Sequence, residues 1–318
     1  MSSRTWLALA LSLALAVLCV EQLAFGEVRA RATATQAKPP RAAARVDGER
    51  GTSLSSPCGI APGLPTAPVG IAAKRGYKLA KNWDFTAQIR DEAKLRSEFQ
   101  TRYIYANGTL DHLNDEWTRY RDNDNHVFST DGLSLVARVK GALAPAGLES
   151  GMLRSRWSGR YGVFEICMRA PAGRGLWPAF WLNPEDGRWP PEIDVVEIVN
   201  DHGSVPDRSF HFLHGKGESA ETPRVSLLDR WGAYPGKVDY SREFHAFSVE
   251  WTSTRVRHLV DGVVVADRAF RWVHDDGSDA GGAHVLVNLA AGGAWAGPPT
   301  EGAVFPASLL IAFMRVWQ

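Results

Sequence analysis

The sequence predicts an all-β fold, either a sandwich or a barrel. Short runs of β-branched and aromatic residues recur along the chain, separated by turn residues, as in 133–138, 161–169 and 244–251. Apolar and polar residues alternate in Phe247–Trp251, which is typical of a strand with one buried face. Only residues 89–100 have a helical pattern. Many strands with few helices indicate a β-sandwich or a β-barrel.

Length and composition narrow the class of protein. The 318 residues can form one β-domain of about 200–250 residues with additional segments. A formal net charge of +1 argues against a general nucleic-acid binder, which would carry an excess of basic residues. The twelve tryptophans provide flat apolar rings that suit both core packing and stacking on sugars, and their number does not separate these uses.

Residues 1–26 are expected to be a secretory signal peptide. Arg4 precedes the apolar segment Trp6–Val20, which is too short for a typical transmembrane helix. Ala24 and Gly26 are small residues at a suitable spacing for cleavage. We therefore expect a secreted or periplasmic protein. An uncleaved segment that anchors the chain to a membrane is the alternative.

Residues 27–73 are expected to form a linker, because they are rich in Ala, Pro, Arg and Gly and lack a hydrophobic period. The folded domain is then residues 74–318. After cleavage of the signal peptide two cysteines remain, Cys58 and Cys167. Export would permit a disulfide between them, and a free, buried Cys167 is the alternative.

Two further elements can be placed within this domain. Asp261-Gly262 joins two apolar runs in residues 258–265 and predicts a tight β-hairpin turn. The segment 309–314 is apolar and is expected to be part of the last strand.

The motif most relevant to function is Glu192-Ile-Asp194-Val-Val-Glu197. Its Ile and Val residues predict a strand, in which Glu192 and Asp194 share one face and Glu197 points to the other. Glu197 would then lie on the apolar face, where an unpaired charge is costly. A β-bulge near 195–196 would return Glu197 to the face of the other two carboxylates, and bulges are common beside active sites.

Carboxylates on one face suggest glycoside hydrolysis. A retaining glycosidase uses two carboxyl groups about 5–5.5 Å apart, one as nucleophile and one as acid/base. Carboxylates held this close cannot all ionise readily, so one of them keeps its proton and can act as the acid. The simpler alternative is a strand with a solvated acidic face.

These segments together resemble glycoside hydrolase family 16, the laminarinase-like β-jelly-roll enzymes. The resemblance extends from Trp83 to Gln318 in consistent order. Its segments are 161–165, Gly173, Gly175, 177–182, 192–197, 244–245, Trp251, 261–262, 287–293, 305–306 and 314–318. It implies a jelly-roll sandwich of two antiparallel sheets with a concave substrate cleft. It also implies that Glu192 is the nucleophile, Glu197 the acid/base, and Asp194 the residue that orients Glu192.

The substrate-binding candidates are mostly aromatic. Trp177 and Trp181 are four residues apart, so a regular strand would place both on one face, either in the cleft or in the core. Trp189 and Trp295 lie in expected loops and could stack on sugars. Family members carry a histidine in the region of 210–215; His211 is preferred over His214, and a structural role is the alternative. Asn288 is expected to face the cleft.

No metal or cofactor is expected. Many family members bind calcium through an Asp in the last strand, and this chain has Ala312 at that position. Losing the carboxylate removes an oxygen ligand and weakens such a site.

The resemblance implies a retaining endo-glycosidase that acts on a β-linked polysaccharide, with β-1,3-glucan as the first choice. With the expected signal peptide, it predicts an exported enzyme, and we expect a monomer. The alternatives are a bacterial exopolysaccharide depolymerase, a transglycosylase and a non-catalytic carbohydrate-binding jelly roll. No nucleic-acid partner is expected.

Overall fold

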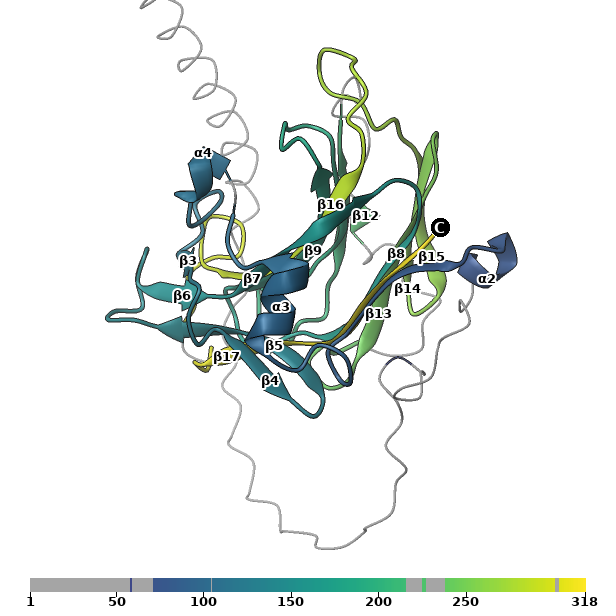
Figure 1. Ribbon diagram of the computed structural model, residues 1–318. Coiled ribbons are helices and arrows are strands. Elements are labelled where there is room, and N and C mark those ends of the chain that lie inside the picture. Colours follow the sequence, from purple (N-terminus) through teal and green to yellow (C-terminus); the bar gives the residue numbers. More distant parts are fainter. Residues whose placement is uncertain (1–57, 59–70, 104, 216–224, 227–237, 301–302) are drawn as a thin grey trace, which may run out of the picture. The chain divides into compact units, whose positions relative to one another are not determined.

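A computed structural model describes residue 58 and residues 71–103, 105–215, 225–226, 238–300 and 303–318 (Figure 1). The expected signal peptide, 1–26, and most of the expected linker lie outside the described residues. No helix in these ranges is long and apolar enough to cross a bilayer.

The predicted all-β sandwich is confirmed, with two sheets stacked on each other (Figure 1). The larger sheet has the order β15 (Val263–Ala269), β14 (Arg255–Val260), β13 (His245–Trp251), β8 (Gly162–Arg169), β17 (Ala307–Trp317), β5 (Gly132–Val139), β6 (Leu148–Ser150) and β3 (Thr118–Tyr120). In addition, β1 (Leu79–Asp84) pairs with β17, and β4 (His126–Ser129) pairs with β5. The β3–β6 pairing is parallel.

The smaller sheet carries the motif Glu192–Glu197 on its strand β10. Its order is β12 (Val225–Ser226), β11 (Phe210–His214), β10 (Glu192–Glu197), β9 (Leu176–Pro184), β16 (Ala283–Ala291), β7 (Met152–Gly159) and β2 (Phe99–Gln100). Each neighbouring pair is antiparallel.

Side chains alternate clearly along β9. Leu176, Phe180 and Leu182 point into the main core between the sheets. Trp177 and Trp181 pack in two separate apolar clusters, on the other face of the strand. This confirms that the two tryptophans share a face, as period-two alternation predicts.

The predicted helix is α3 (Glu92–Glu98), within the expected range 89–100. Asp91 caps it by accepting a hydrogen bond from the Lys94 amide, and Leu95 is buried. Two shorter helices, α2 (Ile71–Arg75) and α4 (Tyr105–Gly108), were not expected from the sequence. Ala72 of α2 is buried in a cluster with Val163 and Trp317.

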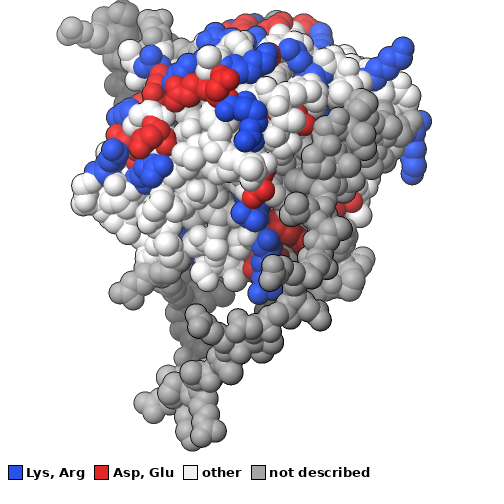
Figure 2. Space-filling model, turned by 60° about the horizontal axis from the view of Figure 1, so that its bottom comes forward, with Lys and Arg blue, Asp and Glu red and all other residues white. Residues whose placement is uncertain are grey.

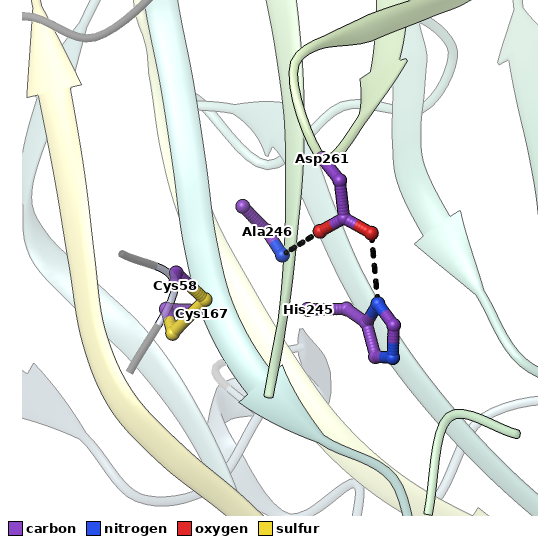
Figure 3. The surroundings of a disulfide bond; sticks show 5 residues. All are labelled: Cys58, Cys167, His245, Ala246 and Asp261. Atoms are coloured by element: carbon purple, nitrogen blue, oxygen red, sulfur yellow. Dashed lines mark hydrogen bonds and ion pairs between the residues drawn. A yellow bond between two sulfur atoms is a disulfide. The ribbon is translucent and has the colours of Figure 1, made fainter. Parts of the chain in front are cut away.

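The predicted hairpin between β14 and β15 is confirmed. Asp261 and Gly262 both have positive φ (49° and 79°), as a tight hairpin turn requires. The Asp261 carboxylate accepts hydrogen bonds from the Ala246 amide and from His245 Nδ1, which fixes the turn against β13 (Figure 3).

The outer face of β13 is less exposed than its alternating sequence suggests. Ser248 and Glu250 are buried, like the apolar residues Phe247, Val249 and Trp251 that alternate with them. Glu250 forms ion pairs with Arg75 and Arg257, which compensate for the burial of its charge. On the face shown in Figure 2, acidic and basic side chains lie next to each other, in keeping with the small net charge.

Cys58 and Cys167 form a disulfide (Figure 3). Of the two alternatives, the structure therefore has the cross-link, which joins residue 58 of the expected linker to β8. Cys167 packs with Ala312 and Phe313 in a small cluster separate from the main core. Ala312, the position at which many family members carry an acid, is fully buried here.

Candidate active site

The predicted bulge in β10 is confirmed. Against β9, the pairing shifts register between Asp194 and Val196, so that Val195 is the extra residue. Against β11, the shift lies between Asp194 and Glu197. Ile193, Val195 and Val196 all belong to the main core. The bulge thus lets two consecutive valines face the core and returns Glu197 to the side of Glu192 and Asp194.

The three carboxylates have distinct partners on this face. Trp177 Nε1 donates a hydrogen bond to Glu197 Oε1 (2.9 Å). His214 Nε2 lies 3.1 Å from Asp194 Oδ2 and 3.7 Å from Glu192 Oε1. Glu192 and Asp194 also share a hydrogen bond. The cluster is therefore bounded by an indole donor at one end and an imidazole at the other.

Burial and mutual repulsion keep protons on the cluster near neutral pH. Burial is the main cause that raises the pKa of Glu197 well above its usual value, and the charge of Asp194 adds to it. The same two causes raise the pKa of Glu192, while the His214 charge opposes them. Burial raises the pKa of Asp194 to about 7. At least one carboxyl can therefore donate a proton at a pH where isolated carboxyls are ionised.

Trp177 and Trp181 lie on the carboxylate face but have little free surface, at 9% and 6% exposure. Trp181 Nε1 donates to Asn288 Oδ1, and Asn288 Nδ2 donates to the Tyr120 hydroxyl, both at 2.9 Å. Asn288 thus lies on the expected side of β16, and both polar atoms of its amide form hydrogen bonds with neighbouring side chains, Trp181 and Tyr120.

The two loop tryptophans differ in their surroundings. Trp295 packs edge-on against Trp177 with 5.0 Å between ring centroids, and it also contacts the rings of Phe210 and Phe212. Trp189 is 61% exposed, and its ring centroid lies 5.9 Å from that of His214. Trp189 is therefore the predicted aromatic residue with the most surface available to a ligand.

The preference for His211 as the cleft histidine is corrected by the structure. Along β11, His214 pairs with Glu192 and Phe212 with Asp194, so the even-numbered residues face the carboxylates. His211 is buried, and its Nδ1 bonds the backbone oxygen of Val195. His214 contacts the carboxylates instead. The register of β11 against β10 decides which of the two histidines faces the carboxylates, and this register could not be predicted from the sequence.

Several residues near the site were not predicted from the sequence. The Tyr105 hydroxyl donates to Asn183 Oδ1 (2.7 Å), and burial raises its pKa to about 12. Tyr103, Tyr105 and Tyr120 form a cluster of rings beside Trp181. Glu116 is buried next to Tyr120, and burial raises its pKa to about 8. The spacing Tyr103-x-Tyr105 was the available signal, but it lies outside the segments that carry the family resemblance.

Glu192, Asp194 and His214 could also hold a cation. Their ligand atoms all lie within 4.8 Å of one another. Within the described ranges this is the one such group of three side chains. The same residues are explained by the proton chemistry of the cluster, which needs no metal ion.

The chain matches one protein family and several known proteins. The sequence profile of glycosyl hydrolases family 16 matches residues 94–301. An endo-1,3-1,4-beta-glycanase, EglC, of Rhizobium meliloti is 36% identical over 172 residues, which are 53% of this chain and 33% of that protein. A beta-glucanase of Rhodothermus marinus is 30% identical over 188 residues, or 52% of this chain and 60% of that protein. The matches thus span between a third and three fifths of these relatives' lengths.

The fold has close counterparts among solved structures. The laminarinase catalytic domain from Thermotoga maritima superposes with a TM-score of 0.60 and 26% identity, over 76% of this chain and 98% of that domain. The endo-beta-1,3-glucanase from Pyrococcus furiosus gives a TM-score of 0.60 and 25% identity, over 76% of this chain and 94% of that one. The expected jelly-roll architecture is confirmed by these superpositions.

Proposed function

Since this chain belongs to glycosyl hydrolase family 16, we propose that it is a retaining endo-glycosidase that cleaves a β-glucan. The observation that carries the proposal is the bulge in β10, which gathers Glu192, Asp194 and Glu197 on one face of the strand. A purely structural strand gains nothing from gathering three carboxyl groups of which two, Asp194 and Glu197, are buried, because burying ionisable groups costs stability. Such clusters with shifted pKa values are typical of active sites.

In the proposed reaction Glu197 is the acid and Glu192 the nucleophile. Glu197 transfers its proton to the glycosidic oxygen while Glu192 attacks the anomeric carbon, which forms a glycosyl-enzyme and releases the first product. The ionised Glu197 then takes a proton from water, and the water oxygen displaces Glu192 with net retention. The raised pKa of Glu197 suits the first step, because the group must be protonated there.

Asp194 has a supporting role in this proposal. It shares a hydrogen bond with Glu192, so the proton between them can rest on Asp194 when Glu192 attacks. His214 lies next to both groups and favours their ionised forms through its charge when protonated. Because the groups interact, a pH–rate profile would report apparent pKa values of the cluster.

β-1,3-Glucan or mixed-linkage β-glucan is the proposed substrate. The proposal is supported by the names of the relatives, endo-1,3-1,4-beta-glycanase and beta-glucanase, and by the laminarinase folds. A bacterial exopolysaccharide remains an alternative polymer. Transfer to a sugar hydroxyl would use the same glycosyl-enzyme, and it would be recognised by products longer than the substrate.

The proposal also includes export, based on residues 1–26. Mass spectrometry of the protein recovered outside the cytoplasm should show a chain that has lost this segment. A retained Met1 region would support the anchored alternative.

The reaction itself is tested by release of reducing ends from laminarin, mixed-linkage β-glucan, galactans and bacterial exopolysaccharides. We expect activity on a β-glucan that Glu192→Gln and Glu197→Gln each reduce by at least ~1,000-fold. Arg188→Gln, an exposed charge change in the loop before β10, serves as the control. A folded wild type that binds a polymer without cleaving any would favour the carbohydrate-binding alternative.

A further inference from the structure

Two buried histidines contact the backbone of the bulge from the core side. His258 Nε2 lies 3.0 Å from the carbonyl oxygen of Asp194. His211 Nδ1 lies 2.6 Å from the carbonyl oxygen of Val195. The two rings are neighbours, with centroids 5.2 Å apart. Two consecutive carbonyl groups of the catalytic strand, those of Asp194 and Val195, thus each accept a hydrogen bond from an imidazole, at the position where the strand changes register.

The bulge creates a need for such donors. Inserting one residue interrupts the ladder of backbone hydrogen bonds, and buried backbone groups at the interruption require other partners. A carbonyl oxygen can only accept, so each imidazole must carry a hydrogen on the nitrogen that faces it. His211 is therefore protonated on Nδ1 and His258 on Nε2.

The burial of both rings is consistent with neutral imidazoles. Burial lowers the pKa of His211 to about 4, and it lowers the pKa of His258 well below its usual value, with a further contribution from His211. The second nitrogen of His211 faces the Ser209 hydroxyl at 3.3 Å. The second nitrogen of His258 has no hydrogen-bond partner among the described residues. Each ring therefore offers a single N–H, and that N–H is directed at the bulge.

The two donors come from different sheets. His211 is on β11, the strand next to β10, whereas His258 is on β14 of the larger sheet. His258 pairs with Val249, a residue of the main core, and therefore reaches the catalytic strand across the interior of the sandwich. The orientation of the peptide groups at 194 and 195 is thus set by both layers of the fold.

We propose that His211 and His258 are positioning residues that aim Glu197. The peptide groups they hold lie between the nucleophile and the acid/base, so their orientation decides the direction in which Glu197 leaves the bulge. Neither histidine touches the substrate. Small errors in the placement of a catalytic group can cost about 100-fold in rate. The inference rests on the proposed glycosidase reaction.

The test moves the N–H donor while keeping its chemistry. A glutamine amide can place its nitrogen where Nε2 of histidine lies, and an asparagine amide can place its nitrogen where Nδ1 lies. His258→Gln and His211→Asn therefore retain the donor positions. His258→Asn and His211→Gln contain the same amide groups, but their nitrogen atoms lie too near to the backbone or too far from it to replace the histidine donor. Thermal melting confirms that each variant is folded.

On the β-glucan that the wild type cleaves, we expect the matched variants to keep kcat within about threefold. The mismatched variants should lose about 10- to 100-fold in kcat with KM unchanged. On a 2,4-dinitrophenyl β-glycoside, whose leaving group needs no proton, release of the phenol in the first turnover should recover to within about threefold of wild type in the mismatched variants. This recovery would locate the defect at the proton donor.

Equal kcat values for matched and mismatched variants would overturn the inference. Mismatched variants that do not fold, beside folded and active matched ones, would also overturn it, because the donors would then hold the sheet together rather than aim Glu197. An inactive wild type would instead overturn the proposed function, which keeps the two failures distinguishable.

Discussion

The indole nitrogen of Trp177 donates a hydrogen bond to Glu197 Oε1 at 2.9 Å. This bond stabilises the ionised form of Glu197 and so lowers its pKa, against the larger effect of burial. The sequence leaves open whether Trp177 lies in the cleft or in the core, and the structure shows that its ring is a direct partner of the Glu197 carboxylate.

Replacing Trp177 with Phe should move the pH–rate profile to higher pH. Without the indole N–H the ionised form of Glu197 loses a hydrogen bond, so its pKa rises and the proton donor survives to higher pH. We also expect kcat/KM to fall by about tenfold, the cost of one hydrogen bond to a charged group. Trp181→Phe is the matched control, because its indole bonds Asn288 instead. An unchanged alkaline limb in Trp177→Phe would show that the bond does not tune the acid.

Replacing Asp194 with Asn should move the alkaline limb of the pH–rate profile to lower pH, opposite to the shift expected for Trp177→Phe. The charge of Asp194 raises the pKa of both Glu192 and Glu197, so its removal lowers both. The alkaline limb of kcat/KM should therefore move to lower pH, with a loss of about 10- to 100-fold at the optimum. The measurement is a pH–rate profile beside that of Trp177→Phe. Shifts of the same sign in both variants would contradict this assignment.

Replacing Glu116 with Gln should stabilise the protein at alkaline pH. The pKa of Glu116 is about 8 in the folded chain and lies near 4.5 in the unfolded chain, so wild-type stability falls as pH rises between these values. The glutamine side chain cannot ionise and can still accept the hydrogen bond from the Leu113 amide. Relative to wild type, the free energy of unfolding of this variant should gain about 1–4 kcal/mol between pH 5 and pH 9.

Chemical denaturation at several pH values measures this gain. Glu98→Gln is the control, because hydrogen bonding and nearby charges lower the pKa of Glu98. That variant should show no gain across the same pH range. A Glu116→Gln variant whose advantage does not grow with pH would show that Glu116 is ionised in the fold without penalty.

Removing the disulfide should lower stability and leave catalysis unchanged. Cys58 and Cys167 are 109 residues apart, and a cross-link over a loop of this length typically contributes about 2–4 kcal/mol. In a domain of this size the melting temperature of Cys58→Ser should fall by about 4–16 °C. The double variant Cys58→Ser/Cys167→Ser should behave alike. Kinetics should be unaltered because Cys167 lies on the larger sheet, outside the main core. A loss of kcat at a temperature where the variant is folded would contradict this separation.

The bulge was predictable because the motif contains a conflict. In Glu192–Glu197 a regular strand cannot bury both valines and keep the three carboxylates together, and one extra residue resolves this. The hairpin at Asp261-Gly262 was predictable because its turn chemistry is local. Trp177 and Trp181 were placed on one face by the period of a strand alone.

Other features depend on tertiary structure and could not be read from the sequence. The register of β11 decides whether His211 or His214 faces the carboxylates, and a shift of one residue exchanges them. The bond between His258 and the Asp194 carbonyl joins residues 64 positions apart, on different sheets. The local alternation of 247–251 predicts that Glu250 faces solvent. Its ion-pair partner Arg75 lies 175 residues away, so the local pattern could not indicate the pairing.

The central claim is that Glu192 and Glu197 act as nucleophile and acid/base in a double displacement. Proton NMR of the first products released from a β-glucan, recorded before mutarotation, tests it most directly. We predict that the β-anomer appears first and that the α-anomer follows slowly. Initial release of the α-anomer would mean that water attacks directly and would contradict the role of Glu192 as nucleophile.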